Sequence, residues 1–471
     1  MVMSTVIFAA AAAALVVAIM VREWRKRKER ESGVKGSLGW PFIGETLEFI
    51  ACAYSSTPES FMDKRRLLYG NVFKSHILGS KTVISTDAEV TRVVLQSDGR
   101  TLVPFYPASL TKLMGSSSIL LINGPQQKRL HGLLGSFLKS AHIKAQITQD
   151  IHSYVSLSMS NWKEGHLVYI QDLTKDIAFQ VLVKALISLD PGEEMEFLKE
   201  QFREFIAGLI SLPINLPGTR LYRSLQAKTK MVKVVLKILG ERKEHGPTSP
   251  PKDVIDVLLS EKMSVDVICD NMIDMMIPGE DSVPILITLA LKYLTDSPLA
   301  LQQLYLENME LKRRKAQEGQ QPCWNDYISL PFMQNVLSET LRMGNIITGV
   351  MRRAVTDVEI KGHLIPKDWC VFTYFRSVHL DDEIYENAHQ FNPWRWQGKD
   401  TCTNNFTPFG GGQRLCPGVD LARLEASIFL HHFVTNYRWV AEEDSVVNFP
   451  TVRMKNRMPI RVTRRPQYCI C

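Results

Sequence analysis

The sequence lacks the cysteine patterns that usually build structure. Its eight cysteines, in a chain of 471 residues, show no paired CxxC spacing and no disulfide framework, so a domain in a reducing compartment fits best. The terminal Cys469-Ile-Cys471 does not match a Cys-a-a-X box, which argues against prenylation. The chain also contains no internal repeat and, beyond its alanine-rich N-terminus, no low-complexity tract.

A strong excess of charge of one sign is also missing. Lys and Arg number 56 and Asp and Glu 49, which gives a net charge of +7, and much of this excess lies near the N-terminus. Such a modest excess does not imply nucleic-acid binding.

Hydrophobic residues, by contrast, are plentiful enough for a large core. They make up 45% of the chain, which suits one large domain or two or three smaller ones. Residues 125–320 are mainly helical by periodicity, whereas 72–85 and 350–374 have strand character, with turns at Gly79 and Gly362. The sequence therefore predicts a mainly α fold with a minor β portion.

One long apolar run begins the chain. Val2 to Val21 carries no charge and, as a helix, would be about 30 Å long, enough to span a bilayer. A basic cluster follows, and positive charge after a span keeps the downstream chain in the cytosol. A cleaved signal peptide is the alternative, but its basic residues would precede the apolar run. We expect residues 1–30 to form a single-pass anchor in the endoplasmic reticulum membrane with a basic stop-transfer, 31–45 a Gly/Pro hinge, and 46–471 one cytosol-facing domain.

Residues 409–418 read FGGGQRLCPG and place one cysteine, Cys416, in a loop built of glycines. Glycines let backbone N–H groups approach a negative sulfur closely, so the loop suits a thiolate metal ligand. The alternative is a glycine-rich turn with an ordinary buried cysteine. A phosphate-binding loop is a poor interpretation, because no Lys-Ser or Lys-Thr follows the glycines.

The same loop resembles the haem-binding signature of the cytochrome P-450 family, FxxGxRxCxG, through Phe409, Gly412, Arg414, Cys416 and Gly418. The resemblance covers essentially the whole sequence and implies the P-450 fold, with 46–471 as its catalytic domain. It implies haem b with Cys416 as the axial thiolate, which favours O–O cleavage. It further implies that Phe409 packs beside the sulfur and that Arg414 pairs with a haem propionate.

A second constellation supports the resemblance. Glu339 and Arg342 stand at i and i+3 on one helix face, and the later segment 391–396 resembles the family's PERF-type segment. The resemblance implies that Glu339, Arg342 and Arg395 form a buried structural triad. An ExxR pair alone could equally be a solvated surface pair.

A third constellation interrupts an apolar helix. Pro278-Gly-Glu-Asp281-Ser282 should open the helix hydrogen-bond ladder, and it resembles the family's oxygen-activation motif, AGx(D/E)T. The resemblance implies that Asp281 and Ser282 relay protons as the catalytic pair. Serine in place of the usual threonine keeps the hydroxyl but loses the methyl that holds its rotamer. A kinked core helix with a solvated acid pair is the alternative.

The family's usual propionate contacts are only partly present. Where Trp or His and then Arg are usual, this sequence has Gln127 and His131, and Arg353 is a further candidate. His131 could instead be a packing residue. Lys128, Arg129 and Lys139 could form a basic face that binds an acidic electron donor. They could equally be the solvated face of a helix.

Shorter segments, including 39–45, 116–120, 211–219 and 369–380, resemble the plant brassinosteroid hydroxylase subgroup, most of all the hydroxylases that act on the steroid side chain at C-23. The resemblance implies a steroid substrate, and electrons from NADPH through a flavoprotein reductase that carries FAD and FMN. Oxidation at C-22 or C-3, or of another isoprenoid, is the alternative. A reductase-independent haem-thiolate isomerase or dehydratase and a non-catalytic sterol-binding haem protein are the remaining rivals.

Overall fold

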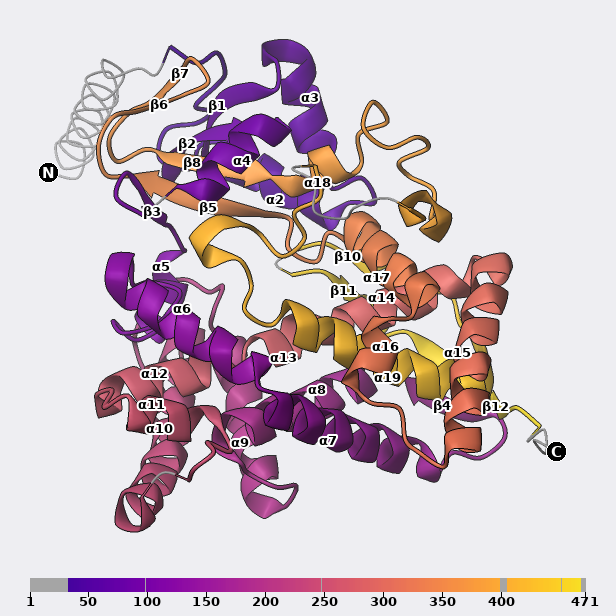
Figure 1. Cartoon of the computed structure of the whole chain (residues 1–471). Coiled ribbons are helices and arrows are strands. Elements are labelled where there is room, and N and C mark those ends of the chain that lie inside the picture. The colour runs from indigo at the N-terminus through magenta and orange to yellow at the C-terminus, as the bar shows by residue number, and fades with distance from the viewer. Residues whose placement is uncertain (1–32, 98, 247, 399–404, 450, 467–471) are drawn as a thin grey trace, which may run out of the picture. The chain divides into compact units, whose positions relative to one another are not determined.

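A computed structural model describes residues 33–97, 99–246, 248–398, 405–449 and 451–466 (Figure 1). The described residues divide into two compact units. The first comprises those up to Phe105 together with Val350–Tyr374, and the second comprises Tyr106–Gly349 together with those from Phe375 onward. Helices make up most of the described residues and strands a small part, which confirms the predicted mainly α fold with a minor β portion. The expected anchor, Val2 to Val21, and the terminal Cys469 and Cys471 lie outside the described residues.

The first unit is built on a five-stranded sheet with the order β1-β2-β8-β5-β3. The strands are β1 Val72–Ile77, β2 Ser80–Ser85, β8 Cys370–Tyr374, β5 Gly349–Ala354 and β3 Leu102–Pro104. β1 and β2 form an antiparallel hairpin that turns at Gly79, as predicted, whereas β2 pairs with β8 in parallel. Its other elements are α2 Thr46–Tyr54, α3 Ser60–Tyr69, α4 Ala88–Gln96 and the hairpin of β6 Val358–Ile360 with β7 His363–Ile365.

Residues 33–45, which belong to the segment expected to be a hinge, dock on β1 of this unit. The N–H of Lys74 donates to the Lys35 carbonyl (2.8 Å), and the N–H of Glu45 donates to the His76 carbonyl (2.8 Å). Gly36 and Gly44 both have positive φ, and a Cβ at either position would collide with the carbonyl oxygen of Lys74 or His76. The glycines of this segment therefore allow close approach to the sheet.

The second unit is predominantly helical. Its helices are α5 Ala108–Leu113, α6 Gly124–Lys139, α7 Ala141–Ser160, α8 Ile170–Ile187, α9 Glu193–Ile206, α10 Arg220–His245, α11 Val254–Ser260, α12 Val265–Asp274, α13 Pro278–Asp281, α14 Val283–Thr295, α15 Pro298–Glu318, α16 Trp324–Ile328, α17 Pro331–Gly344, α18 Phe375–His379 and α19 Val419–Asn436, with 3₁₀ turns η1 Pro393–Trp396 and η2 Gly412–Arg414. The remaining strands are β4 His166–Tyr169, β9 Tyr437–Ala441, β12 Pro459–Arg464, β10 Val446–Val447 and β11 Arg453–Met454.

The core of the second unit surrounds α14, whose residues 283–291 are all buried. A helix that is apolar on every side must be covered on every side, and α14 packs against α8, α17 and α19. α19 also packs against α7, α15 and α16 (Figure 1). α19, which directly follows the cysteine loop, is therefore part of this core.

Within the described part of the protein, no single helix combines the length and hydropathy of a membrane span. The segments Val265–Thr295 and Pro298–Glu318 meet those criteria only as a pair, and they are bent by 117° relative to each other.

Candidate functional site

The cysteine loop of the second unit is a sequence of tight turns. Gly410 and Gly412 adopt φ of 75° and 62°, a region in which a side chain would be strained. The N–H of Cys416 donates to the Phe409 carbonyl (3.1 Å), and the N–H of Leu415 donates to the Gly412 carbonyl (3.1 Å). The loop thus presents a partly exposed Cys416 just ahead of α19, whose N-cap is Gly418.

The electrostatics at the sulfur fit a metal ligand. Burial raises the pKa of Cys416, and the N–H of Gly418, which donates to the sulfur, partly opposes this rise. A thiolate here therefore needs a cation at the sulfur, because a coordinating metal holds a thiol deprotonated. No group of three or more His, Cys, Asp or Glu side chains able to hold a metal occurs among the described residues. A single sulfur donor suits a metal whose other ligands come from a macrocycle, as in haem.

Arg414 ties the cysteine loop to the segment before α6. Its guanidinium donates to the carbonyls of Ile119 (3.1 Å) and Ile122 and to Asn123 Oδ1 (2.7 Å). These neutral acceptors hold the arginine in place beside Cys416, and a propionate contact would add a charged acceptor to this set.

The residues expected near the propionates lie in different units. Gln127 Nε2 donates to the Gln413 carbonyl (3.2 Å), and His131 Nε2 bonds to the Leu415 carbonyl (2.6 Å). Both therefore brace the cysteine loop from α6. Arg353 lies on β5, in the first unit, and its propionate role stays a prediction.

The structure brings Glu339, Arg342 and Arg395 together. Glu339 accepts from Arg342 Nη2 (2.8 Å) and Nε (2.9 Å), and from Arg395 Nε (2.9 Å). The indole N–H of Trp396 and the N–H of Asn392 donate to the same carboxylate, each at 2.9 Å. The side chains of Glu339 and Arg342 are both 0% exposed, so this is a buried, fully hydrogen-bonded ion pair.

His379 extends this network to the cysteine loop, and the sequence analysis missed it. The N–H of Thr407 donates to His379 Nε2 (3.1 Å), so Nδ1 carries the proton and donates to Asn345 Oδ1 (2.7 Å). The carbonyl of His379 accepts from Arg342 Nη1 (2.7 Å). Burial, with smaller effects from two nearby arginines, lowers the pKa of His379 to about 3, so it is neutral. Its contacts are all remote in sequence, so no spacing could reveal them.

The predicted interruption of the apolar helix occurs at Ser282, between α13 and α14. Ser282 has φ −127° and ψ −71°, and both its N–H (3.1 Å) and its hydroxyl (2.6 Å) donate to the Pro278 carbonyl. A proline at 284 cannot donate to the next carbonyl in the ladder. The hydroxyl is thus held at a break in the helix.

The two acids beside Ser282 differ in their surroundings. Glu280 pairs with Lys175 Nζ at 2.5 Å, whereas Asp281 lies 4.0 Å from the same nitrogen. Burial raises the pKa of Asp281; Lys175 and Arg453 oppose this rise, and Glu280 adds to it. Asp281 therefore holds a proton more readily than an exposed aspartate, as a relay group requires.

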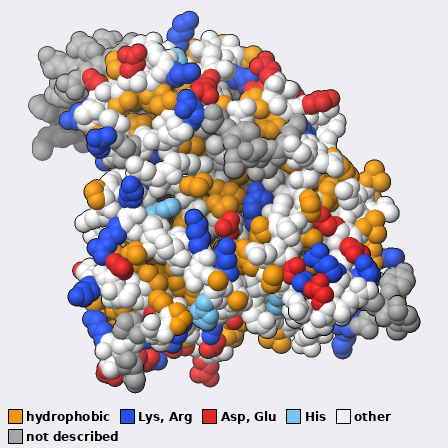
Figure 2. Space-filling model, viewed as in Figure 1, with side chains coloured by type: hydrophobic (Ala, Val, Ile, Leu, Met, Phe, Trp, Pro, Cys, Tyr) orange, Lys and Arg blue, Asp and Glu red, His pale blue; other side chains and the backbone are white. Residues whose placement is uncertain are grey.

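The basic residues of α6 do not form a uniform patch. Lys128 and Lys139 are exposed, but Arg129 pairs with Glu261 at 2.9 Å. Figure 2 shows Lys and Arg side chains on this unit interspersed with acidic and hydrophobic ones, and over α15 the two charges lie side by side. The ion pairs of α15, such as Arg313 with Glu310 (2.6 Å), explain the latter pattern.

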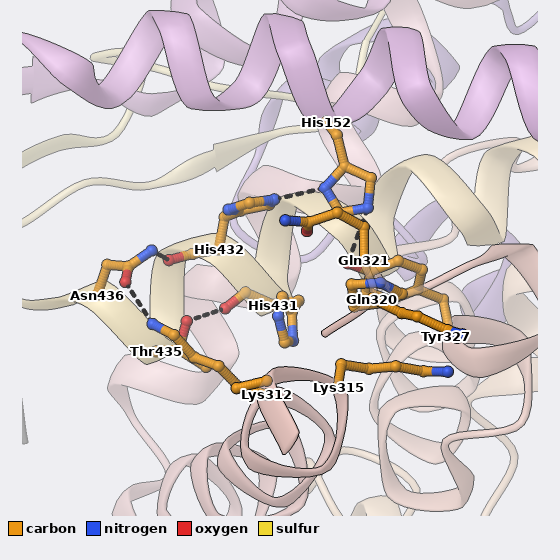
Figure 3. Close-up of a pocket in the computed structure, with 12 residues that line it drawn as sticks. His152, Lys312, Lys315, Gln320, Gln321, Tyr327, His431, His432, Thr435 and Asn436 are labelled. Atoms are coloured by element: carbon orange, nitrogen blue, oxygen red, sulfur yellow. Dashed lines mark hydrogen bonds between the residues drawn. The ribbon is translucent and has the colours of Figure 1, made fainter. Parts of the chain in front are cut away.

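A separate pocket of about 200 Å³ lies among α7, α15, α16 and the end of α19 (Figure 3). In it, His152 Nδ1 bonds to His432 Nε2 (2.8 Å), and Tyr327 Oη bonds to His152 Nε2 (3.1 Å). Burial lowers the pKa of His152, and it lowers that of His432 to about 3. At 1.5 Å per residue, this pocket is about 20 Å along α19 from its start, so it does not belong to the cysteine site.

Comparisons with known proteins agree with this geometry. The sequence model of the family described as Cytochrome P450 matches residues 34–464. A protein of Arabidopsis thaliana named 3-epi-6-deoxocathasterone 23-monooxygenase CYP90D1 is 61% identical over 435 residues, covering 91% of this chain and 89% of its own. A second A. thaliana protein, 3-epi-6-deoxocathasterone 23-monooxygenase CYP90C1, is 57% identical over 447 residues, covering 92% and 85%. The solved structure of retinoic acid bound cyanobacterial CYP120A1 shares the fold, with a TM-score of 0.80 and 21% identity over 92% of this chain and 100% of that one. The chain belongs to the cytochrome P450 family.

Proposed function

We propose that this protein is a haem-thiolate monooxygenase that hydroxylates C-23 of a brassinosteroid precursor. The single observation that carries the proposal is high identity, over nearly the whole sequence, to two enzymes that are both named as 23-monooxygenases of one steroid. The cysteine loop and the acid-hydroxyl pair of this protein supply the groups that such a reaction needs.

When bound, the haem supplies the chemistry that activates oxygen and oxidises an unactivated C–H bond. Cys416 would hold its iron through the sulfur, and the N–H of Gly418 would support the negative charge on that sulfur. Phe409 would limit water beside the sulfur, and Arg414 would pair with one propionate through its guanidinium. Asp281 holds a proton, and the Ser282 hydroxyl passes it on. The Pro278 carbonyl accepts a hydrogen bond from that hydroxyl and so fixes its position at the helix break.

The partners follow from the same proposal. Electrons come from NADPH through an FAD- and FMN-containing reductase, which docks on the side of α6 that carries Lys128 and Lys139. The apolar run Val2 to Val21, followed by its basic cluster, anchors the enzyme in the endoplasmic reticulum membrane with the catalytic domain in the cytosol. An apolar steroid that partitions into that membrane would reach the enzyme there.

The test is reconstitution of the full-length protein in microsomes with reductase, NADPH and a panel of campestanol-type steroids. We expect one oxygen atom to be added at C-23, with stoichiometric use of NADPH and O₂. Cys416→Ser is the control, since it removes the ligand and should abolish the product. A product oxidised at C-22 or C-3 would overturn the proposed position, and turnover without NADPH would overturn the monooxygenase assignment.

A further inference from the structure

A buried carboxyl group without a hydrogen-bond partner lies at the end of α12. Asp274 is only 3% exposed, and among the described residues neither of its oxygens has a hydrogen-bond partner. Buried polar atoms in native proteins are almost always paired, so each exception calls for an explanation. It is unlike Asp270, one turn earlier on the same helix, which pairs with Lys228 Nζ at 3.1 Å.

The surroundings of Asp274 compensate only in part for the burial of its carboxyl group. Asp274 is the last residue of α12, where the helix dipole disfavours a negative charge. Burial raises the pKa of Asp274 to about 7, against the opposing effects of the Ser118 hydroxyl and the Lys228 charge. Ser118 Oγ is bonded to the Met114 sulfur (3.6 Å). Even if Ser118 turned its proton toward Asp274, it could satisfy only one of the two carboxyl oxygens.

The helix that carries Asp274 is linked to the cysteine site. Asn271, three residues earlier, accepts from the N–H of Ile119 (2.8 Å) and donates to the Ser117 carbonyl (2.9 Å). Arg414, two residues before Cys416, donates to the Ile119 carbonyl (3.1 Å). One short segment, 117–119, is thus bonded to both α12 and the cysteine loop. Along the helix, Asp274 precedes Pro278, whose carbonyl holds Ser282, by about one turn.

A carboxyl group of this kind suits an alcohol. With a pKa near neutrality it can accept a hydrogen bond as a carboxylate or donate one as an acid, and a hydroxyl group can serve as the partner of either form. The gain is largest in a dry site, where the unpaired group is otherwise costly. An apolar steroid that carries hydroxyl groups offers few other polar contacts.

We propose that Asp274 is a specificity-determining residue that hydrogen-bonds a hydroxyl group of the steroid substrate. This inference rests on the proposed function, since it assumes that a steroid occupies the site next to Cys416. It predicts that the enzyme discriminates strongly between a hydroxylated steroid and the same steroid lacking that group, because the analogue would leave Asp274 unpaired.

The experiment measures steroid affinity of the haem-loaded full-length protein from the shift of its Soret band. The ligands are a 3,22-dihydroxylated steroid, its 22-deoxy analogue and its 3-deoxy analogue. In the wild type, removal of one of the two hydroxyls should weaken binding about 10–100-fold, the range for a hydrogen bond to a charged group. In Asp274→Leu the ratio of the dissociation constants of the deoxy analogue and the dihydroxylated steroid should fall to about threefold or less. Binding of the deoxy analogue itself should be unchanged or tighter.

Two further variants guard the interpretation. Asp274→Asn retains the shape and should fold if the leucine variant does not. Its neutral amide can still hydrogen-bond a hydroxyl, but more weakly than a charged group, so the ratio should fall to a value between those of the wild type and the leucine variant. Glu425→Gln is the matched control, because Glu425 on α19 is also buried, with Oε1 unpaired among the described residues. We expect it to keep the wild-type ratio.

The outcomes separate the two proposals. A ratio that survives in both Asp274 variants, while the wild type still hydroxylates steroid, would overturn the role of Asp274 alone. A wild type that neither binds nor oxidises any steroid of the panel would overturn the proposed function and this inference with it.

Discussion

Thr407 and His379 join the cysteine loop to the buried ion pair through one hydrogen bond, from the Thr407 N–H to His379 Nε2 at 3.1 Å. His379 in turn offers its carbonyl to Arg342 (2.7 Å), which pairs with Glu339. The conformation of the loop two residues before Phe409 therefore depends on a neutral histidine as well as on the ion pair.

Removal of Glu339 should abolish haem loading. Glu339→Ala leaves Arg342 and Arg395 buried without a counterion, which costs about 3–5 kcal/mol. We expect little or no red-shifted Soret absorbance of a reduced, carbon monoxide-bound haem thiolate per unit of purified protein. Glu310→Ala is the matched control, since Glu310 and Arg313 form the same i, i+3 pair on the surface of α15. It should load haem normally, and normal loading of the Glu339 variant would remove the triad assignment.

Loss of the His379 side chain should disturb the thiolate site specifically. His379→Ala leaves the Thr407 N–H and Asn345 without their partner and should destabilise the fold by about 1–3 kcal/mol. Because Thr407 leads into the cysteine loop, the reduced carbon monoxide complex should also shift partly to a form without thiolate ligation. His431→Ala removes another buried histidine, bonded to Asn308 (3.0 Å) toward the far end of α19. It should lose stability and keep the thiolate spectrum; equal spectra in the two variants would contradict the link.

Ser282→Ala should separate oxygen consumption from product formation. The variant keeps the helix break, which depends on Pro278 and Pro284, but loses the hydroxyl held by the Pro278 carbonyl. We expect product per NADPH to fall about tenfold, somewhat less than the 10²–10⁴-fold contribution typical of proton transfer, with the excess electrons appearing as hydrogen peroxide. Ser282→Thr should retain coupling. Unchanged coupling in the alanine variant would rule out a relay role for this hydroxyl.

Acid should destabilise the second unit through its buried histidines. Burial lowers the pKa of His432 from its ordinary value of 6.5 to about 3 in the folded protein. Below pH 6.5 the unfolded protein therefore binds more protons than the folded protein does. Stability should therefore be complete above pH 6.5 and decline as the pH falls toward 3. At pH 5 this one residue should have lowered the free energy of unfolding by up to about 2 kcal/mol relative to neutral pH. Urea unfolding at pH 7.5 and 5 measures this loss. The difference in unfolding free energy between the two pH values should be smaller in His432→Asn than in the wild type, and an equal difference in both proteins would contradict the prediction.

The sequence predicted those features of the site that depend on residues close together along the chain. Glu339 and Arg342 are neighbours by helix geometry, and Ser282 lies at a helix break because two prolines and a glycine surround it. Thr407 and Asn345, by contrast, meet His379 only through the tertiary fold, and Arg414 finds acceptors nearly 300 residues earlier in the sequence. The docking of 33–45 on β1 was also out of reach, since Gly and Pro in that segment are equally typical of a flexible hinge.

The sheet of the first unit has a consequence for how the protein is made. β2 pairs in parallel with β8, and Thr82 meets Cys370 about 290 residues later in the sequence. At translation rates of about 5–20 residues per second, the β2 edge waits roughly 15–60 s for its neighbour. During that time an unpaired strand edge is exposed on the nascent polypeptide. The N-terminal part, although synthesised first, can only be completed after most of the helical unit has left the ribosome.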